Sequence, residues 1–290
     1  MRLLLAAVAI TTAIAAAQSR PEFEVASIKL NVDGTPYVFN GMKSLGVFAS
    51  VNQTLRNLIQ EAYGTPSGRR NWLPVHAVGA GMPILGGPDW IGSDRYDITA
   101  KWHARPGDGQ TMQSIGKAQA EMELMLRSLL ESRFQVQVHR ETRELPVYEL
   151  TVATPGKLKK ASCTVFDPAS ELPPDPSARY CGASTEGRKG LDWTLEGSSM
   201  KMPELAGALS LFAGDRPVID KTGFTETFDV HLQWTPELNQ IGARDVPGSP
   251  DSSTGSIFTV IQDQLGLRLK PGRGTVEVLV VDHAERPSPN

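Results

Sequence analysis

Two periodicities of apolar residues alternate along the chain, and together they predict an α+β fold. Apolar residues at every second position over about four to eight residues are typical of a half-buried strand, whereas spacings of three and four are typical of a helix with one buried face. The clearest helical pattern lies in residues 119–133, where Met122, Leu126 and Leu129 share one face. The clearest alternation lies in residues 95–102. Strands and helices are therefore interleaved along the chain.

The same patterns predict an ordered series of elements, which we describe in two units. The first unit is a strand at 23–28, a strand at 47–51, a helix at about 54–63, the strand at 95–102, the helix at 119–133 and a hairpin of 134–138 with 147–152. The second unit is a strand at 191–195, a helix at 203–212, a strand at 227–234, a helix at 256–265 and a hairpin of 267–269 with 276–281. Asn52 or Thr54 can cap the first helix and Gly64 can end it.

The second unit repeats the first at nearly constant spacing. At an offset of 147 (195 minus 48), Phe48, Leu55, Leu58 and Ala62 fall on Leu195, Met202, Leu205 and Leu209. At an offset of 132 (229 minus 97), Asp97, Trp102, Met125, Leu126 and Leu129 fall on Asp229, Trp234, Ile257, Phe258 and Ile261. After small slips, Phe134, Val136 and Val152 fall on Leu267, Leu269 and Val280. We therefore predict two similar halves, each with two helices packed on a largely antiparallel sheet.

The N-terminus has the features of a cleaved secretory signal. Arg2 precedes an apolar run over residues 3–17 that ends in three alanines. The run is shorter than the roughly 20 residues that a helix needs to cross a bilayer, and no later segment is apolar enough to do so. We expect a mature protein that begins near Gln18, has no stable membrane span after cleavage, and is periplasmic or secreted.

Composition divides the rest of the chain. We assign residues 1–17 to the signal peptide, 18–153 to the first half, 154–190 to a linker rich in proline, glycine, serine and charge, and 191–290 to the second half. The linker contains the two cysteines of the chain, Cys163 and Cys181. In an exported protein such a pair predicts a disulfide, and closing this loop stabilises the fold by about 3 kcal/mol in the loop-entropy model.

Charge argues against a nucleic-acid partner. The formal net charge is -3, and it becomes -4 when Arg2 leaves with the signal peptide. Both signs are scattered along the chain, so the basic stripe that phosphate binding requires is missing.

No complete catalytic or metal-binding motif is present. Ser198-Ser199-Met200-Lys201 followed by Lys221-Thr222-Gly223 resembles the S-x-x-K and K-T-G motifs of penicillin-recognising serine enzymes. However, Pro203 places the helix start after Lys201, so the serine and lysine do not share a helical turn. The five histidines include no pair at i, i+4. We predict no catalytic residue, no metal and no cofactor, which favours binding over catalysis.

The candidate binding residues lie in the segment before and within the strand at 95–102. They are Trp90 with the acidic residues Asp89, Asp94 and Asp97. An indole beside carboxylates suits carbohydrate contact in an exported protein, whereas the alternative is a tight turn that docks the tryptophan on the first half. If the protein is instead an enzyme, these carboxylates indicate a hydrolase or lyase that acts on envelope or plant-derived glycans.

Several segments together resemble a known family. They are FEVASIK, NQTLRNLIQEAYG, GGPDWIGSDRYDITAK, LLESRFQVQVHRETRELPVYELTVA, RPVIDKTGFTETFDVHLQW and QLGLRLKPGRGTVEVLVVDHAERPSPN. The chain is similar to the soil-associated family of exported bacterial proteins of unknown function, whose domain also occurs attached to penicillin-sensor-type membrane metallopeptidases. The resemblance implies export and this domain layout, implies no catalytic residue or cofactor, and suggests sensing or regulation by analogy.

Three hypotheses follow. The leading one is an exported binding or interaction module of the cell envelope, whose ligand is an envelope protein or a small molecule bound in a cleft between the halves. The second is the glycan-directed hydrolase or lyase. The third is a purely structural envelope protein, which predicts no concave pocket and an exposed apolar patch or open sheet edge.

Overall fold

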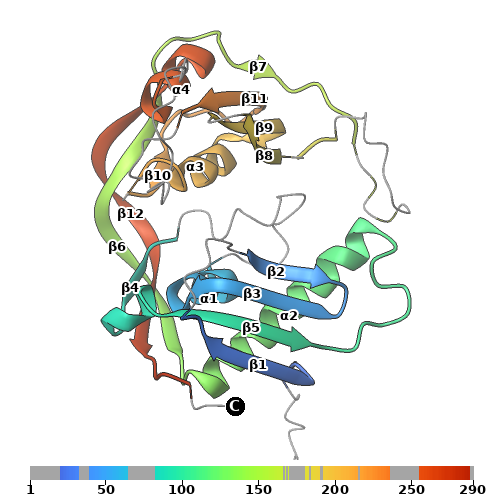
Figure 1. The fold of residues 1–290 in the computed structure, drawn as a ribbon. Coiled ribbons are helices and arrows are strands. Elements are labelled where there is room, and N and C mark those ends of the chain that lie inside the picture. The colour runs from blue at the N-terminus through green and yellow to red at the C-terminus, as the bar shows by residue number, and fades with distance from the viewer. Residues whose placement is uncertain are drawn as a thin grey trace, which may run out of the picture.

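The fold is taken from a computed structural model. It describes residues 20–32, 39–64, 82–165, 167, 169, 180–182, 184–189, 192–214, 216–235 and 255–287. The predicted signal peptide, 1–17, lies outside the described residues. The strands and helices form two lobes and a long two-stranded ribbon that connects them (Figure 1).

The first lobe, which we call the N-lobe, is a four-stranded antiparallel sheet with two helices. The sheet order is β1 (Val25–Leu30), β5 (Arg95–Lys101), β3 (Val47–Thr54) and β2 (Phe39–Ser44). The helices are α1 (Leu55–Tyr63) and α2 (Met112–Arg133), and a short 3-10 helix, η1 (Asp89–Gly92), precedes β5. Thr54 caps α1 by accepting a hydrogen bond from the backbone N–H of Asn57 at 3.2 Å, so the predicted helix start is confirmed.

The second lobe, which we call the C-lobe, has the same kinds of parts. Its antiparallel sheet has the order β7 (Lys159–Lys160), β11 (Thr227–Trp234), β9 (Asp192–Lys201) and β8 (Ser184–Lys189). Its helices are α3 (Met202–Ser210) and α4 (Ile257–Leu265). Strands β7 and β8 fall within the segment that the sequence assigned to a linker. The predicted disulfide between Cys163 and Cys181 is present and lies between them.

The ribbon consists of β6 (Gln137–Val152) and β12 (Leu267–His283), which pair antiparallel over their whole length. It runs along one side of the molecule from one lobe to the other (Figure 1). Two short strands extend it: β4 (Ile84–Gly86) lies parallel to the end of β12, and β10 (Val218–Asp220) lies parallel to the end of β6.

The two predicted hairpins are wrong. The sequence predicts that residues 134–138 pair with 147–152 and that 267–269 pair with 276–281, but residues 137–138 lie with 147–152 in the single strand β6, and both segments of the second pair lie in the single strand β12. The charged middle of β6 is exposed, and this charge is the reason that the sequence predicts a turn there. It instead pairs with the equally exposed middle of β12, where Glu144 accepts a hydrogen bond from Arg273 at 2.8 Å. Exposure there comes from the ribbon passing between the lobes.

Each lobe has its own hydrophobic core, and the ribbon contributes to both. The N-lobe core joins one face of β5 (Tyr96, Ile98, Ala100) to α1 and α2, and it includes Leu279 and Val281 from β12. The C-lobe core joins β11 to α3 and α4, and it includes Leu150 from β6. The N-lobe core therefore includes residues of β12, which follows the C-lobe helices in the chain, and the C-lobe core includes a residue of β6, which follows the N-lobe helices.

The coarse fold class is confirmed. The described residues form four α-helices and several sheets that are mostly antiparallel. Helix α2 begins earlier than the apolar pattern indicated, because Thr111 and Ser114 form a reciprocal capping box with hydrogen bonds of 3.0 and 3.1 Å.

Candidate functional site

Trp90 and Asp94 are two of the four predicted binding residues. The structure brings them together, and the side chain of Arg286 contacts both of them. The guanidinium carbon of Arg286 lies 5.0 Å from the centroid of the Trp90 ring. The Nε of the same side chain donates to Asp94 Oδ2 at 2.8 Å. Arg286 follows β12, so the C-terminal segment covers this place on the N-lobe. Asp89 is exposed at the first turn of η1.

Asp97 has a structural part in the sheet. Its Oδ1 accepts a hydrogen bond from the backbone N–H of Asn52 at 2.8 Å and one from Asn31 Nδ2 at 3.0 Å. Asn52 has a φ of 54°, at an irregularity where the β3–β5 pairing shifts between Ser50 and Gln53. A carboxylate that supports a bulge in this way is committed to the fold. The four predicted residues thus do not form one open site.

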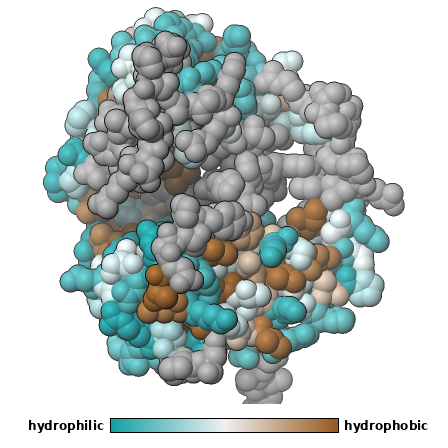
Figure 2. Space-filling model, in the orientation of Figure 1, coloured by the Kyte–Doolittle hydropathy of each residue, from teal (hydrophilic) through white to brown (hydrophobic). Residues whose placement is uncertain are grey.

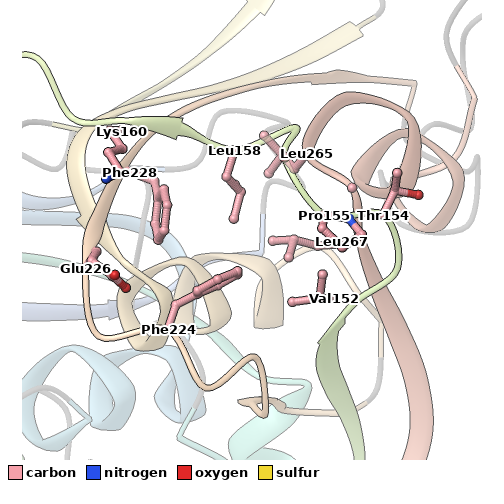
Figure 3. A pocket seen from close by; sticks show the side chains of 12 residues that line it. Val152, Thr154, Pro155, Leu158, Lys160, Phe224, Glu226, Phe228, Leu265 and Leu267 are labelled. Carbon is pink, nitrogen blue, oxygen red and sulfur yellow. The ribbon is translucent and has the colours of Figure 1, made fainter.

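An open pocket lies on the C-lobe (Figure 3). Its volume is about 220 Å³. The lining residues come from the end of β6, from β7, from the connection before β11 and from the end of α4. They are Val152, Thr154, Pro155, Gly156, Leu158, Lys160, Phe224, Glu226, Phe228, Leu265, Gly266 and Leu267.

Apolar side chains form the body of the pocket. Figure 3 shows Phe224, Leu158, Leu267 and Val152 converging on the cavity. The rings of Phe224 and Phe228 make an edge-to-face contact at 5.2 Å between centroids, which fixes their orientation. Burying an apolar group of a ligand here is favourable because it removes apolar surface of both molecules from water.

Local backbone features shape the pocket wall. Helix α4 ends at Gly266, whose φ of 68° is left-handed, and the Gly266 carbonyl accepts the backbone N–H groups of Ala153 and Thr154 at 2.8 and 2.9 Å. These bonds turn the chain after β6. Strand β7 then places Lys160 opposite Phe228, so the chain passes over the cavity.

Charged groups of both signs stand at the rim. Glu226 and Lys160 are exposed and lie on the Phe228 side of the pocket (Figure 3). Glu226 accepts a hydrogen bond from the backbone N–H of Thr225 at 3.3 Å. The arrangement suits a ligand with an apolar body and a polar end.

A second cavity, of about 370 Å³, lies on the N-lobe between Arg20, the end of α1 and the start of β6. Tyr63 donates to Glu131 at 3.0 Å, and Glu131 also forms an ion pair with Arg20. Burial, followed by the hydrogen bond to Glu131, raises the pKa of Tyr63 well above its usual range. These polar groups satisfy one another. The expected cleft between the halves is neither of these two cavities, since each lies within one lobe.

The exposed surface of the N-lobe carries apolar residues at one sheet edge. Val25, Leu30 and Val32, in or just after the edge strand β1, have exposed fractions of 65%, 55% and 78%. Among the described residues on the face shown in Figure 2, apolar residues are interspersed with hydrophilic ones.

Within the described part of the chain, no helix combines the length and apolar character needed to cross a membrane. Over the same residues, histidine, cysteine, aspartate and glutamate side chains do not gather in groups of three or more that could hold a metal ion.

The residues that sequence reasoning missed are those of the C-lobe pocket, above all Phe224 and Glu226. A signal for them was present. They stand in the segment GFTETFD, which follows the same order of aromatic, acidic, aromatic and Asp as DWIGSDRYD around Trp90.

Comparisons with known proteins give one match. The model of a family described as "Protein of unknown function (DUF3738)" matches residues 56–284. No curated protein and no solved structure matches the chain.

Proposed function

The chain belongs to this family of unknown function, DUF3738, and we propose that it is an exported binding module of the bacterial cell envelope whose ligand enters the C-lobe pocket. Export is supported by the signal-like N-terminus and by the Cys163–Cys181 disulfide. A sensory or regulatory role is the form of binding that the family resemblance favours. The proposal rests on a relation between the two lobes.

The lobes are, in this proposal, two copies of one unit, and the strand register supports it. In the N-lobe, Phe48 pairs with Ala100, Ser50 with Ile98 and Gln53 with Tyr96. At offsets of 147 for the first member (195 minus 48) and 132 for the second (232 minus 100), these pairs become those of the C-lobe. They are Leu195 with Leu232, Gly197 with Val230 and Met200 with Phe228.

The bulge repeats as well. Asn52 and Ser199, 147 positions apart, have φ values of 54° and 59°. The Ser199 backbone N–H donates to Asp229 Oδ1 at 3.1 Å, as that of Asn52 donates to Asp97. A left-handed conformation is uncommon for residues other than glycine, so its recurrence with the same carboxylate partner supports common descent.

The ribbon supports the same relation and improves the alignment. The carbonyl of Pro83 accepts the N–H of Leu279, and the carbonyl of Pro217 accepts that of Tyr148, both at 2.9 Å. The two accepting prolines are 134 positions apart (217 minus 83). The two donating residues, Tyr148 and Leu279, are 131 positions apart (279 minus 148). An offset of 131 brings Val136 onto Leu267, in place of the alignment of Phe134 with Leu267 that the sequence suggested.

The observation that carries the proposal is a difference between the two copies. Phe224 corresponds to Trp90 at the offset of 134 found for the prolines (224 minus 90), and Glu226 corresponds to Asp94 at the offset of 132 found for the strands (226 minus 94). At the ribbon's offset of 131 (286 minus 155), however, Pro155 corresponds to Arg286. In the N-lobe the arginine lies against the aromatic ring and pairs with the carboxylate. In the C-lobe the proline leaves a cavity there. One copy is closed by its own chain and the other is open to a ligand.

The experiment fills the C-lobe pocket by replacing Pro155 with arginine and measures whether a ligand still binds. We expect the mature protein to bind N-acetylnorleucine methylamide, an apolar side chain on a neutral backbone, with NMR shifts centred on Leu158, Phe224 and Leu267. Pro155→Arg should abolish these shifts by filling the pocket, while the control Pro155→Ala should retain them. Shifts scattered over the surface, or unchanged by Pro155→Arg in a folded protein, would contradict the proposal.

A purely structural role is the second candidate, because of the exposed apolar residues of the edge strand β1. Edge strands of this kind promote association with another chain. The concave C-lobe pocket argues against structure as the only role.

A further inference from the structure

The side chain of Arg286 makes, within the N-lobe, the kind of contacts that a ligand could make with the C-lobe pocket. Its guanidinium contacts an aromatic ring, with 5.0 Å between its carbon and the Trp90 centroid, and a carboxylate, through the 2.8 Å bond to Asp94. These are the two partners that a planar cation prefers, namely the negative face of a ring and a hydrogen-bond-accepting anion. The aliphatic stem of arginine can meanwhile lie along apolar surface.

The C-lobe pocket offers the same two partners and an apolar channel for the stem. Phe224 supplies the ring and Glu226 the carboxylate, while Leu158, Val152 and Leu267 supply the apolar wall. The cavity volume of about 220 Å³ lies below the range of about 300–1,000 Å³ that is typical of pockets for drug-sized ligands. The size matches an anchor residue better than a large cofactor.

Lys160 also lies at the rim of the pocket, and its positive charge affects how a cation would bind there. It lies in β7, opposite Phe228, and its side chain is exposed on a flexible stem. Together, Lys160 and Glu226 leave the rim without net charge, so a cation is not drawn from a distance. The cationic end of a ligand is instead selected by contact with Glu226 and Phe224, after the ligand's aliphatic stem has entered the pocket.

We propose that the C-lobe pocket binds the arginine side chain of a partner polypeptide, with Glu226 accepting from the guanidinium and Phe224 lying against its face. This inference rests on the proposed function, since it names the ligand class of the same pocket. Arginine suits the site better than lysine because a planar guanidinium can stack on a ring and donate to a carboxylate at once.

The test compares arginine with its uncharged isostere. N-acetylarginine methylamide and N-acetylcitrulline methylamide have side chains of nearly the same shape, and only the first is a cation. We expect the mature protein to bind the arginine probe about fivefold more tightly by NMR titration at low salt, because Glu226 is exposed and its ion pair is partly screened. Glu226→Gln should remove the preference, whereas Lys160→Gln should keep or increase it.

The outcomes separate this inference from the proposed function. Equal affinity for the two probes, or a preference that survives in Glu226→Gln, would overturn cation recognition while leaving an apolar binding pocket. Binding of the norleucine probe without the arginine probe would do the same. If none of the three probes bound at Phe224 and Leu158, both the inference and the proposed function would fail.

Discussion

Replacing Leu126 by alanine is expected to lower the free energy of unfolding by about 2–5 kcal/mol, the range for leucine deletions in a packed core. Leu126 is fully buried in α2 and belongs to the N-lobe core. That core also contains Leu279 and Val281 of the ribbon, so a cavity there weakens the docking of β12 as well as of the helix. Urea unfolding followed by circular dichroism would measure the loss.

The matched control is Leu124→Ala. Leu124 lies in the same helix and is 40% exposed, so it undergoes the same change in helix propensity without the same cavity. We expect about 0.5 kcal/mol or less, as for surface substitutions in general. Equal losses for the two variants would show that α2 does not bury the face assigned to it.

Gly266→Ala is expected to cost about 3–5 kcal/mol, through a left-handed φ and a steric collision. The φ of Gly266 is 68°, and a Cβ there would lie closer than 3.0 Å to the carbonyl oxygen of Thr154. Relief of the clash would separate the end of α4 from the chain that follows β6. These two segments form one wall of the C-lobe pocket, so both thermal stability and probe binding should fall.

Gly156→Ala controls for backbone conformation. Gly156 also lines the pocket and has a φ of 87°, but an added Cβ would have open space around it. We expect only the backbone penalty, about 1–2 kcal/mol, and retention of the pocket. The difference in melting temperature between the two variants isolates the collision. If Gly156→Ala were as damaging as Gly266→Ala, the contact with Thr154 would not be the cause.

The local parts of the fold could be predicted from the sequence because their causes are local. Helix α1 starts at the hydroxyl cap of Thr54, a residue recognisable by its type and position. Strands β5 and β11 alternate because one face of each covers a core. In both cases the deciding contacts lie within a few residues of the pattern.

The ribbon could not be predicted in this way, because its partner is remote in sequence. Val147 pairs with Gly272 and Val138 with Val281, more than 100 positions away. A charged segment between two alternating ones is equally typical of a hairpin turn and of a strand that crosses open space between lobes. Only the pairing distinguishes them.

The sequence predicts an aromatic residue beside carboxylates, and the structure has such a pair in more than one place. An aromatic residue beside a carboxylate does occur at Trp90 and Asp94, but Arg286, almost 200 positions later, occupies it. A second aromatic residue and carboxylate, Phe224 and Glu226, line the C-lobe pocket. In the proposed alignment Arg286 corresponds to Pro155, and that correspondence depends on the long-range pairing of β6 with β12, which no local pattern indicates.

The most direct test of the account is a crystal structure of the Pro155→Arg variant. If the two lobes are copies of one unit and the C-lobe pocket is its open site, the introduced guanidinium should lie against the ring of Phe224 and pair with Glu226, as Arg286 does with Trp90 and Asp94. An introduced side chain that points into solvent, over a pocket as open as before, would contradict the correspondence on which the proposed function rests.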